Sequence, residues 1–571
     1  MSRFRISLSV ALALAFMASP SFAAEFYVDP AAASASGTGT TQDPWQTLES
    51  VVQAGRFGSV IKAGDTVWLR SGYHGEFVVS GGSYATPITI AAAPGATPRL
   101  RRVSLSGTQG WIVKGLSVSP SHAPTYQKAT MVQISGSSSN ITIENNLLFS
   151  IDDASGWSAA DWDQLSANGI QAGGTNITLR GNTVKNSNFG ISVDASDSLV
   201  EKNVVDSFAG DGLRGLGNRT TFQYNVVKNC YDVNANHDDG FQSWSVGTGG
   251  VGTGEVTGVV LRGNLILNYE DPNQPFRGSL QGIGCFDGTY VDWIVENNVI
   301  ITDHWHGITF LGARNVRVVN NTVIDRNDVS PGPPWIQIGN HKNGTAPSGC
   351  LVRNNLTTDL NNATSGVTED HNLIVTDLTA LFVDARAFDL HLVPGAAAAI
   401  DVGSPDQAPS GDIEGIPRPQ GDGIDLGAYE WHDGSVQPDG GLGSGGSASG
   451  SGGSSGAVGS GGSTGDGGSG ALTSGGTTGS GGNAAGGSSG SGGSSGSSSG
   501  SSGTSGTSGS SGNTAGDPGS AGAEDDAGCS CRFAGDARDQ RSLAALAFAL
   551  LMFQRKRSAR TSLKKTHTSR S

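Results

Sequence analysis

The chain has 571 residues, of which 35 are Lys or Arg and 50 are Asp or Glu, so its formal net charge is −15. Such an acidic chain lacks the basic face that phosphate backbones require, which argues against a nucleic-acid partner. Of the 88 glycines, 37 lie between Gly434 and Gly528, so a large part of the chain builds no hydrophobic core.

The first residues have the order of a secretory signal. Arg3 and Arg5 precede an apolar run from Leu8 to Met17, and small residues follow it. This run is too short to cross a bilayer, which takes about twenty helical residues. We therefore expect residues 1–24 to be a signal peptide, and the protein to be secreted.

The segment after Glu25 predicts a strand and a cap. A strand is expected to begin at Gly64-Asp65 after a loop, and a small helix is expected from Trp45 to Val52. An uncapped stack of strands would expose unpaired edges, so a covering helix is expected at its start.

One template recurs from residue 140 to residue 355: a polar turn, alternating apolar residues and an asparagine. The shortest asparagine spacings are 21, 22 and 23 residues, which allows two short strands in each unit. A unit this small cannot bury its own apolar face, but stacked copies form a continuous core. Asparagine tolerates a left-handed turn, and stacked amides can hydrogen-bond from coil to coil. The repeated asparagines are Asn146, Asn182, Asn203, Asn225, Asn264, Asn298, Asn321 and Asn355.

A second repeated pattern lies between these asparagines, and each copy begins with glycine and an apolar residue. Since side chains alternate along a strand, the apolar residues should point inward and the next residues outward. The expected inward residues are Ile170, Ile191, Leu213, Phe241, Ile283 and Ile308. The expected outward column is Gln171, Ser192, Arg214, Gln242, Gly284 and Thr309.

Together these patterns predict an all-β fold over residues 25–432, a right-handed parallel β-helix solenoid with an N-terminal cap. The opening segments, residues 26–30, 63–70 and 87–95, and two later segments, residues 415–419 and 423–430, resemble those of secreted pectate-lyase-like β-helix proteins. This resemblance implies a polysaccharide substrate or ligand. Cys230, Cys285 and Cys350 are expected to be small buried side chains.

Residues 232–244 concentrate groups that can do chemistry. Asp239 precedes a glycine as Asp211 does one coil earlier, and coils about 4.8 Å apart would bring the two carboxylates within about 5 Å. Asp-Gly is also an ordinary turn dipeptide, but the longest insertions, near residues 245–257 and 269–279, lie beside it. The candidate catalytic residues are Asp211, His237, Asp239, His304 and His306, and the candidate substrate-binding residues are Arg214, Gln242, Trp244 and Asp287.

A cation site is predicted in the same stretch. Its alternating oxygen donors suit Ca²⁺, and residues 238–241, Asp-Asp-Gly-Phe, resemble the calcium-binding element of family 9 pectate lyases. That family has a further aspartate where this chain has Gln242, and a lysine base where it has Gly284. The predicted calcium ligands are Asp211, Asn234, Asn236, Asp238 and Asp239.

Three functions fit these residues. In a polysaccharide lyase acting on an acidic glycan, a cation or an arginine would neutralise a uronate and a base would remove the neighbouring proton, with His304, His306 and Arg214 as the local candidates. In a glycoside hydrolase, two carboxylates would flank the bond: Asp211 and Asp239 at about 5–5.5 Å for retention, or Asp238 and Asp211 at about 6.5–9.5 Å for inversion. A solenoid that only binds glycan, as an adhesin does, is the third possibility.

The C-terminal part predicts a tether. Residues 433–528 are rich in Gly and Ser, which is typical of a disordered linker. Cys529 and Cys531, an apolar run from Leu543 to Phe553 and a basic cluster at 555–557 resemble the myxobacterial C-terminal sorting signal. The resemblance implies that residues 529–571 anchor the protein at the outer cell surface. We expect a monomer there.

Overall fold

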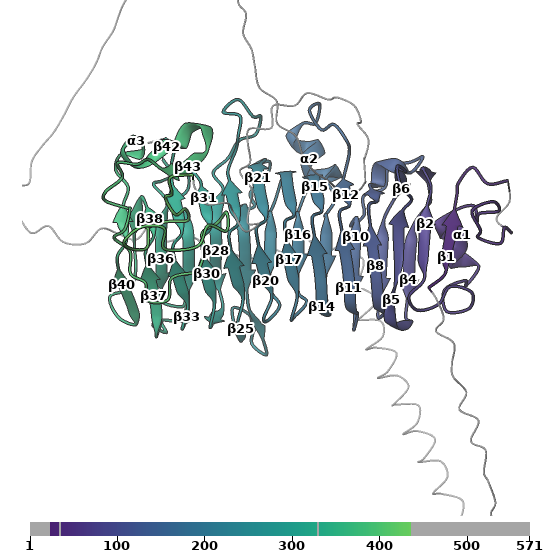
Figure 1. The fold of residues 1–571 in the computed structure, drawn as a ribbon, viewed down its shortest axis with the longest axis horizontal. Helices are drawn as coiled ribbons and strands as arrows, with labels where there is room; N and C mark the ends of the chain where they lie inside the picture. Colours follow the sequence, from purple (N-terminus) through teal and green to yellow (C-terminus); the bar gives the residue numbers. More distant parts are fainter. Residues whose placement is uncertain (1–22, 34–35, 328–329, 435–571) are drawn as a thin grey trace, which may run out of the picture. The chain divides into compact units, whose positions relative to one another are not determined.

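The computed structural model describes residues 23–33, 36–327 and 330–434 (Figure 1). All of them belong to one compact unit, Met1–Ser455. Residues 1–22 of the predicted signal peptide, all but the first two residues of the predicted linker and the whole predicted sorting signal lie outside the described residues. Within the described ranges, no helix is both long and apolar enough to cross a membrane.

Three long parallel sheets, here called sheets I, II and III, form the body, and each complete coil contributes one strand to each sheet. Sheet I contains β1 (Glu25–Val28), β2 (Thr66–Leu69), β5 (Ser83–Ala92), β8 (Gln109–Lys114), β11 (Ser139–Glu144), β14 (Thr175–Arg180), β17 (Leu199–Glu201), β20 (Thr221–Gln223), β26 (Val260–Arg262), β30 (Ile294–Glu296), β34 (Arg317–Val319), β37 (Cys350–Arg353) and β40 (Val367–Asp370).

Sheets II and III complete each coil. Sheet II contains β4 (Phe77–Ser80), β7 (Val103–Ser106), β10 (Val132–Ser135), β13 (Ile170–Ala172), β16 (Ile191–Val193), β19 (Leu213–Gly215), β22 (Asp239–Trp244), β28 (Gln281–Asp287), β32 (His306–Leu311), β36 (Trp335–Gly339) and β39 (Asp359–Leu360). Sheet III contains β3 (Gly72–Tyr73), β6 (Pro98–Leu100), β9 (Ser117–Val118), β12 (Leu147–Phe149), β15 (Thr183–Ser187), β18 (Val204–Phe208), β21 (Val226–Cys230), β27 (Leu265–Leu267), β31 (Val299–Ile301), β35 (Thr322–Ile324), β38 (Leu356–Thr357) and β41 (Leu373–Ile374).

The remaining described elements are short and lie in the loops and at the two ends of the stack. The small strands are β23 (Val246–Gly247), β24 (Gly250–Val251), β25 (Glu255–Thr257), β29 (Thr289–Val291), β33 (Ala313–Arg314), β42 (Phe382–Asp384) and β43 (Asp389–Leu392). The helices are α1 (Leu48–Gln53), α2 (Ala159–Leu165) and α3 (Leu378–Leu381), with 3₁₀ turns at Pro120–His122 and Ala385–Ala387.

The prediction of two strands per unit is wrong, because the chain bends within the asparagine template and passes from one sheet to the next. The residue before each repeated asparagine has a positive φ, for example 53° at Lys202 and 55° at Tyr224, which bends the chain from sheet I to sheet III. The left-handed position is thus one residue earlier than the repeated asparagine itself. A third strand then follows in each coil.

The predicted asparagine ladder is confirmed. Both the backbone N–H and the side-chain amide of Asn203 donate to Oδ1 of Asn225, each at 3.0 Å, and the amide also donates to the Leu179 carbonyl at 2.9 Å. The same pairing runs through all eight repeated asparagines and on to Asn372. Because these amides are buried, each coil is held at a fixed height over the next.

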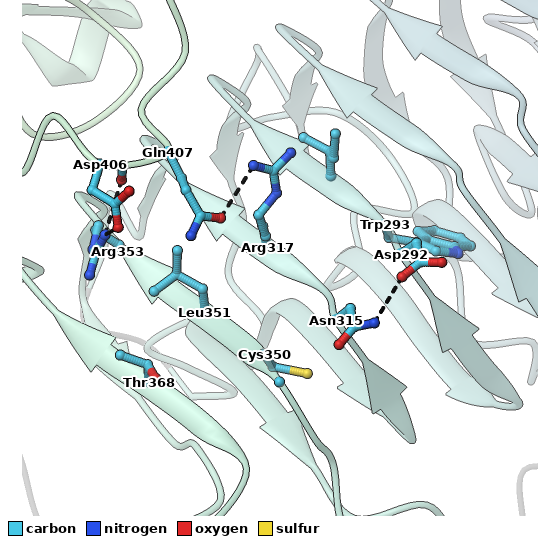
Figure 2. Close-up of a pocket in the computed structure, with 12 residues that line it drawn as sticks. Asp292, Trp293, Asn315, Arg317, Cys350, Leu351, Arg353, Thr368, Asp406 and Gln407 are labelled. Atoms are coloured by element: carbon cyan, nitrogen blue, oxygen red, sulfur yellow. Dashed lines mark hydrogen bonds and ion pairs between the residues drawn. The ribbon is translucent and has the colours of Figure 1, made fainter.

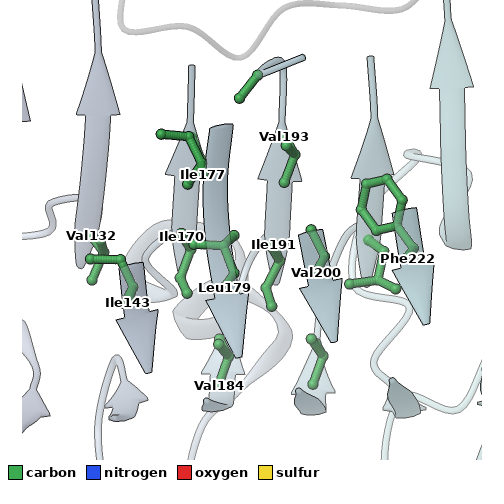
Figure 3. Close-up of a cluster of buried hydrophobic side chains, with 14 of the residues drawn as sticks. Val132, Ile143, Ile170, Ile177, Leu179, Val184, Ile191, Val193, Val200 and Phe222 are labelled. Atoms are coloured by element: carbon green, nitrogen blue, oxygen red, sulfur yellow. The ribbon is translucent and has the colours of Figure 1, made fainter. Parts of the chain in front are cut away.

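The interior of the coils is filled by the predicted inward residues (Figure 3). Ile170, Ile191, Leu213 and Phe241 are paired partners in successive strands of sheet II, and each is at most 2 % exposed. The outward residues are paired in the same way as far as Thr309. Gln242 and Thr309 are nevertheless buried, because neighbouring side chains cover the outer face of sheet II there.

The cap at the N-terminal end is α1, which begins at Leu48 rather than at the predicted Trp45. The Thr47 side chain accepts a hydrogen bond from the Ser50 N–H and so fixes the start of the helix. Trp45 stays extended, forms a bridge with Val28 and stacks on Phe26 with ring centroids 5.1 Å apart.

The described end of the chain packs along the outside of sheet III. Val299, Ile300 and Ile301 of β31 are all buried, whereas the equivalent strand β18 presents Asp206 to the surface side. A strand that is apolar on both faces needs cover, and residues 375–428 supply it as a second hydrophobic cluster.

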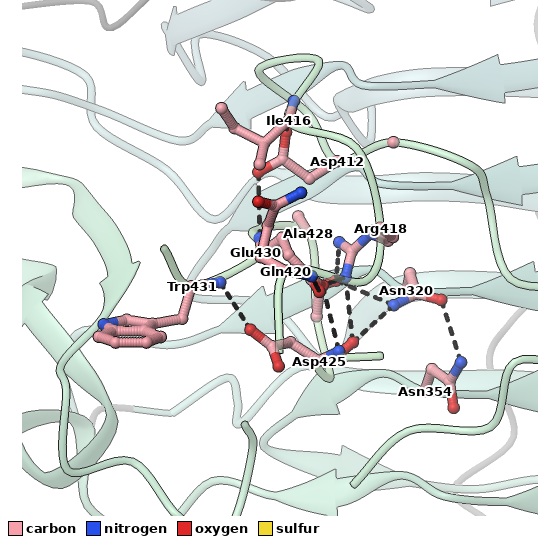
Figure 4. A network of polar contacts seen from close by, with 12 residues as sticks. Asn320, Asn354, Asp412, Ile416, Arg418, Gln420, Asp425, Ala428, Glu430 and Trp431 are labelled. Carbon is pink, nitrogen blue, oxygen red and sulfur yellow. Dashed lines mark hydrogen bonds and ion pairs between the residues drawn. The ribbon is translucent and has the colours of Figure 1, made fainter. Parts of the chain in front are cut away.

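Residues 375–434 are here called the closing segment. A buried polar network holds this segment in place (Figure 4). The fully buried Arg418 donates to Glu430 at 2.7 Å and to the Asp425 carbonyl at 3.1 Å. The corner residue Asn320 donates its amide to the same Asp425 carbonyl at 2.9 Å, and Asn354 donates to the Ser404 carbonyl at 2.8 Å. The left-handed corners that turn the coils thus also anchor the closing segment along their side.

Replacing one member of the ladder should destabilise the fold. Asn225→Ala leaves the N–H groups of Asn203 and the Val200 carbonyl without their buried partner, so the free energy of unfolding should fall by about 2–3 kcal/mol. Urea unfolding measures this loss. Asn361→Ala, an exposed control, should change stability by less than about 0.5 kcal/mol; equal losses for the two variants would contradict a special role for the ladder.

The hydrogen bonds of His391 on β43 should make the stability of the fold depend on pH. Hydrogen bonds to Glu414 and Asp389 raise the pKa of His391 to about 9, so protonation favours the folded state. The stabilisation is fully present below about pH 6.5, the ordinary histidine pKa, and is lost as the pH rises through about 9. The melting temperatures of the wild type and His391→Gln should therefore differ most near pH 6 and converge above pH 9. A constant difference across this range would refute this pH dependence.

Candidate functional site

The candidate residues gather on the outer face of sheet II, where the chain passes from sheet III into strands β19, β22, β28 and β32. Arg214, Gln242, Gly284 and Thr309 are aligned partners in these four strands. The residues just before and within these strands supply the polar groups. The predicted columns therefore meet on one face, as expected.

A β-bulge shapes the floor of this face. Ser243 pairs with Cys285 and Trp244 with Asp287, which leaves Phe286 as the extra residue of β28. The Phe286 ring centroid lies 4.8 Å from that of His306 and 6.5 Å from that of His237. A Cβ at Gly284 would stand 2.0 Å from Asp239 Oδ1 and 2.5 Å from the Phe286 ring, so only glycine fits there.

His237 and Asp239 form a hydrogen-bonded pair. His237 Nδ1 lies 3.2 Å from Asp239 Oδ2, which also accepts a 2.9 Å bond from the Gln242 amide. The Asp239 side chain is fully buried, whereas that of His237 is 32 % exposed. Burial raises the pKa of Asp239 to about 7, and hydrogen bonding to His237 opposes that rise. The histidine is the member of the pair that can meet a ligand.

Asp211 serves the neighbouring arginine. Its side chain is 1 % exposed, forms an ion pair with Arg214 Nε and accepts the Asp239 N–H at 3.1 Å. The Arg214 guanidinium lies 3.5 Å from the Phe189 ring centroid and 5.4 Å from that of Trp244. Arg214 is thus held between an aromatic ring and a buried carboxylate, with its charge close to the surface.

His304 and His306 stack on each other with ring centroids 5.2 Å apart. His304 Nδ1 accepts the His306 N–H at 3.0 Å, and His306 Nδ1 lies 2.9 Å from Thr309 Oγ1. Burial, followed by the charges of His304 and His237, lowers the pKa of His306 to about 3. His306 is therefore a neutral imidazole at physiological pH.

The predicted calcium ligands do not converge. Asp238 is buried and accepts hydrogen bonds from the Asn236 amide at 2.9 Å and from Cys230 Sγ at 3.4 Å, and burial raises its pKa well above the ordinary value. Asn234 turns away to Asp163 of α2. Within the described ranges, no three His, Cys, Asp or Glu side chains are grouped as metal ligands. In this arrangement the oxygens of Asp238 and Asn234 are near partners within the protein, and a calcium ion at these residues stays a prediction.

Asp287, predicted to bind substrate, forms an ion pair with Lys342, whose Nζ lies 2.9 Å from Oδ1. Sequence reasoning missed Lys342, because it comes from the loop after β36, two strands further along sheet II. It also missed Phe189, Phe286 and Trp335, whose ring centroid lies 5.3 Å from that of His306. Nothing in the sequence around these residues marks them as part of a site. Only the alignment of neighbouring coils shows that they lie beside the candidate residues.

Two surface hollows lie elsewhere, beside sheet I. One of about 690 Å³ lies between strands β30 to β40 and residues 406–407 of the closing segment (Figure 2). Its arginines are already bound within the protein, Arg353 to Asp370 and Asp406, and Arg317 to Gln407. The second, of about 800 Å³, is lined by residues such as Glu201, Arg262 and Asp412. None of the predicted site residues lines either hollow.

Comparisons with known proteins agree with the fold. Residues 168–356 match the family model described as "Right handed beta helix region", and the chain is therefore a right-handed parallel β-helix. Solved structures with a related arrangement include the pectate lyase Pel9A, at 16% identity over 72% of this chain and 96% of that chain, with a TM-score of 0.36. A rhamnogalacturonan lyase matches at 16% identity over 63% and 90%, with a TM-score of 0.37. The A-module of the mannuronan C-5 epimerase AlgE6 from Azotobacter vinelandii matches at 15% identity over 57% and 89%, with a TM-score of 0.39. No curated protein matches the sequence.

Proposed function

We propose that this protein is a polysaccharide-active β-helix that cleaves an acidic glycan by β-elimination on the outer face of sheet II. The observation that carries the proposal is the pairing of a partly exposed His237 with the buried Asp239, next to an Arg214 held by the buried Asp211. One group can remove a proton, and the other can hold a carboxylate.

Arg214 is proposed to bind the carboxylate of the sugar that loses a proton. Its ion pair with Asp211 and its contact with Phe189 restrict the side chain before the ligand arrives. A fixed guanidinium neutralises a uronate and stabilises the negative charge that spreads onto the carboxylate as the proton leaves. Trp244, on the other side of the guanidinium, adds an apolar wall.

His237 is the proposed general base. When its Nδ1–H donates to Asp239, the lone pair is on Nε2, and the carboxylate stabilises the imidazolium that forms. The base takes the proton from the carbon beside the carboxyl group, the electron pair forms a carbon–carbon double bond, and the bond to the neighbouring glycosidic oxygen breaks. That oxygen takes a proton from solvent, and His237 later releases its own.

The remaining polar groups are positioning residues. Gln242 holds Asp239 through the hydrogen bond from its amide to Oδ2, while His304 and the neutral His306 can exchange hydrogen bonds with sugar hydroxyl groups. Asp239 and Asp211 act through His237 and Arg214, because both carboxylates are buried. The same burial disfavours a glycoside hydrolase, in which both carboxyl groups must reach the scissile bond.

Glycan binding without catalysis is the alternative. Arg214, Trp244 and the two histidines would serve a binding face equally well, and a missing elimination product would favour this reading. We further propose that the protein acts as a monomer at the cell surface. That proposal depends on the signal-like N-terminus and the C-terminal segment after Gly528.

Loss of the base should abolish elimination and leave the fold intact. On a panel of polyuronates, His237→Gln should lower kcat by about 10²–10⁴-fold, the usual contribution of a general base. Asp239→Asn should lower kcat in the same direction, because the amide no longer stabilises the imidazolium. The ultraviolet absorbance of the unsaturated product measures the rate. His371→Asn, an exposed histidine beside β40, is the control; a His237→Gln variant as active as this control would exclude His237 as the base.

Loss of the arginine should weaken the use of acidic substrate. Arg214→Gln should reduce kcat/KM about 10–100-fold, since a charge-assisted hydrogen bond contributes about 1.5–3 kcal/mol. The variant also leaves Asp211 as an unpaired buried charge, so the Asp211→Asn/Arg214→Gln double variant serves as a folded comparison. Arg180→Gln, which breaks a surface ion pair on sheet I, should retain full activity. If the double variant matches the wild type, Arg214 does not bind the uronate.

A further inference from the structure

The loop between β31 and β32 displays an aromatic side chain beside the site. All ten tryptophans lie within the described ranges, and Trp305 is the one among them that is exposed, at 42 %. Trp45, Trp111, Trp162 and Trp293, by comparison, are at most 1 % exposed. An exposed indole leaves a large apolar surface in water, so this one is a candidate for covering by a ligand.

The loop that carries Trp305 is hydrogen-bonded to the neighbouring coils. Its backbone carbonyl accepts hydrogen bonds from the Gly307 N–H at 3.0 Å and the Trp335 N–H at 2.7 Å. Thr302, at the start of the loop, is fully buried and donates its hydroxyl to the Leu280 carbonyl. The indole lies 5.6 Å from the His304 ring, between centroids, at an interplanar angle of 69°. The indole is therefore carried by a hydrogen-bonded backbone and lies next to His304, a residue of the proposed site.

We propose that Trp305 is a sugar-binding platform that holds a second unit of the acidic polysaccharide, away from the unit held by Arg214. This inference rests on the proposed function and extends it to the length of the ligand. The apolar C–H face of a pyranose ring packs against an indole face, which removes apolar surface from water on both sides. His304, whose ring lies next to the indole, supplies a polar group for the equatorial hydroxyls at the edge of such a ring.

The register gives the spacing between the two positions. Arg214 lies on β19 and Trp305 immediately precedes β32, so three coil steps separate them along sheet II. At about 4.8 Å per coil, three steps correspond to about 14 Å along the solenoid axis. One monosaccharide cannot span this distance. The site therefore binds a run of several sugar units along the solenoid axis, with an acidic unit at Arg214 and the apolar face of another unit at Trp305.

The occupant is a polymer segment rather than a free sugar. The arrangement thus assigns to the protein a preference for oligosaccharides over monomers and dimers.

Binding can be measured apart from cleavage in the full chain carrying His237→Gln. Calorimetric titrations with polygalacturonate, alginate and their size-fractionated oligomers would compare this chain with versions that also carry Trp305→Ala, Trp305→Phe or, as a control, Trp68→Ala on sheet I. We expect Trp305→Ala to weaken binding of the polymer and of longer oligomers at least tenfold, and Trp305→Phe to weaken it much less. Dimers should bind weakly and equally to all variants, and Trp68→Ala should match the parent.

The outcomes separate this inference from the proposed reaction. Loss of affinity on Trp305→Ala in a protein whose wild type releases no unsaturated product supports the platform and overturns the lyase. An unchanged affinity on Trp305→Ala, an equal loss for dimers and polymer, or the absence of binding to both glycans and their oligomers overturns the platform. Circular dichroism shows whether Trp305→Ala is folded. If it is unfolded, the inference is tested instead by comparing the affinities of the Trp305→Phe and Trp305→His variants for the polymer.

Discussion

The stacking of coils at one fixed height is the constraint on which the rest of this structure depends. Backbone hydrogen bonds join each coil to the next, and the buried asparagine ladder repeats that spacing in side-chain amides. An unpaired buried amide costs free energy, so a coil cannot slip without breaking several bonds at once. The fixed spacing turns a repeat in sequence into straight columns of side chains in space.

The candidate site exists because the repeat is locally interrupted. The bulge in β28 brings Phe286 to the outer face, and the missing side chain at Gly284 leaves room for both this ring and the Asp239 carboxylate. Around them the loops from sheet III to sheet II are long, and α2 holds one of them through the bond from Asn234 to Asp163. The regular coils thus fix the positions of the side chains, and the bulge, the glycine and the long loops create the environment of the candidate site.

Charge is distributed unevenly over this face. Of the three buried carboxyl groups, Asp238 and Asp239 have raised pKa values, caused first by burial and then by the neighbouring charge of Asp211. Arg214 and His237 compensate part of this charge at the surface side. Burying several acids near one another is costly, and such a cost is commonly retained where it serves a site.

The sequence by itself determined the solenoid, the ladder and the columns. Apolar residues that alternate in a period of two, with one asparagine in each copy of the template, predict stacked coils, and Asp211, Asp239 and Arg214 were therefore placed correctly on neighbouring coils. Local signals misplaced the start of α1 and hid the third strand, because a cap at Thr47 and a left-handed corner depend on single residues.

Only the tertiary structure decided what each polar side chain binds. The sequence grouped Asp211, Asn234, Asn236, Asp238 and Asp239 as ligands of one cation, yet they turn to Arg214, Asp163, Asp238, Cys230 and His237. Partners such as Phe286 and Lys342 come from other coils, at distances in sequence that no local pattern encodes. A repeat specifies where a residue lies, while its rotamer and partners follow from packing against residues that the repeat does not describe.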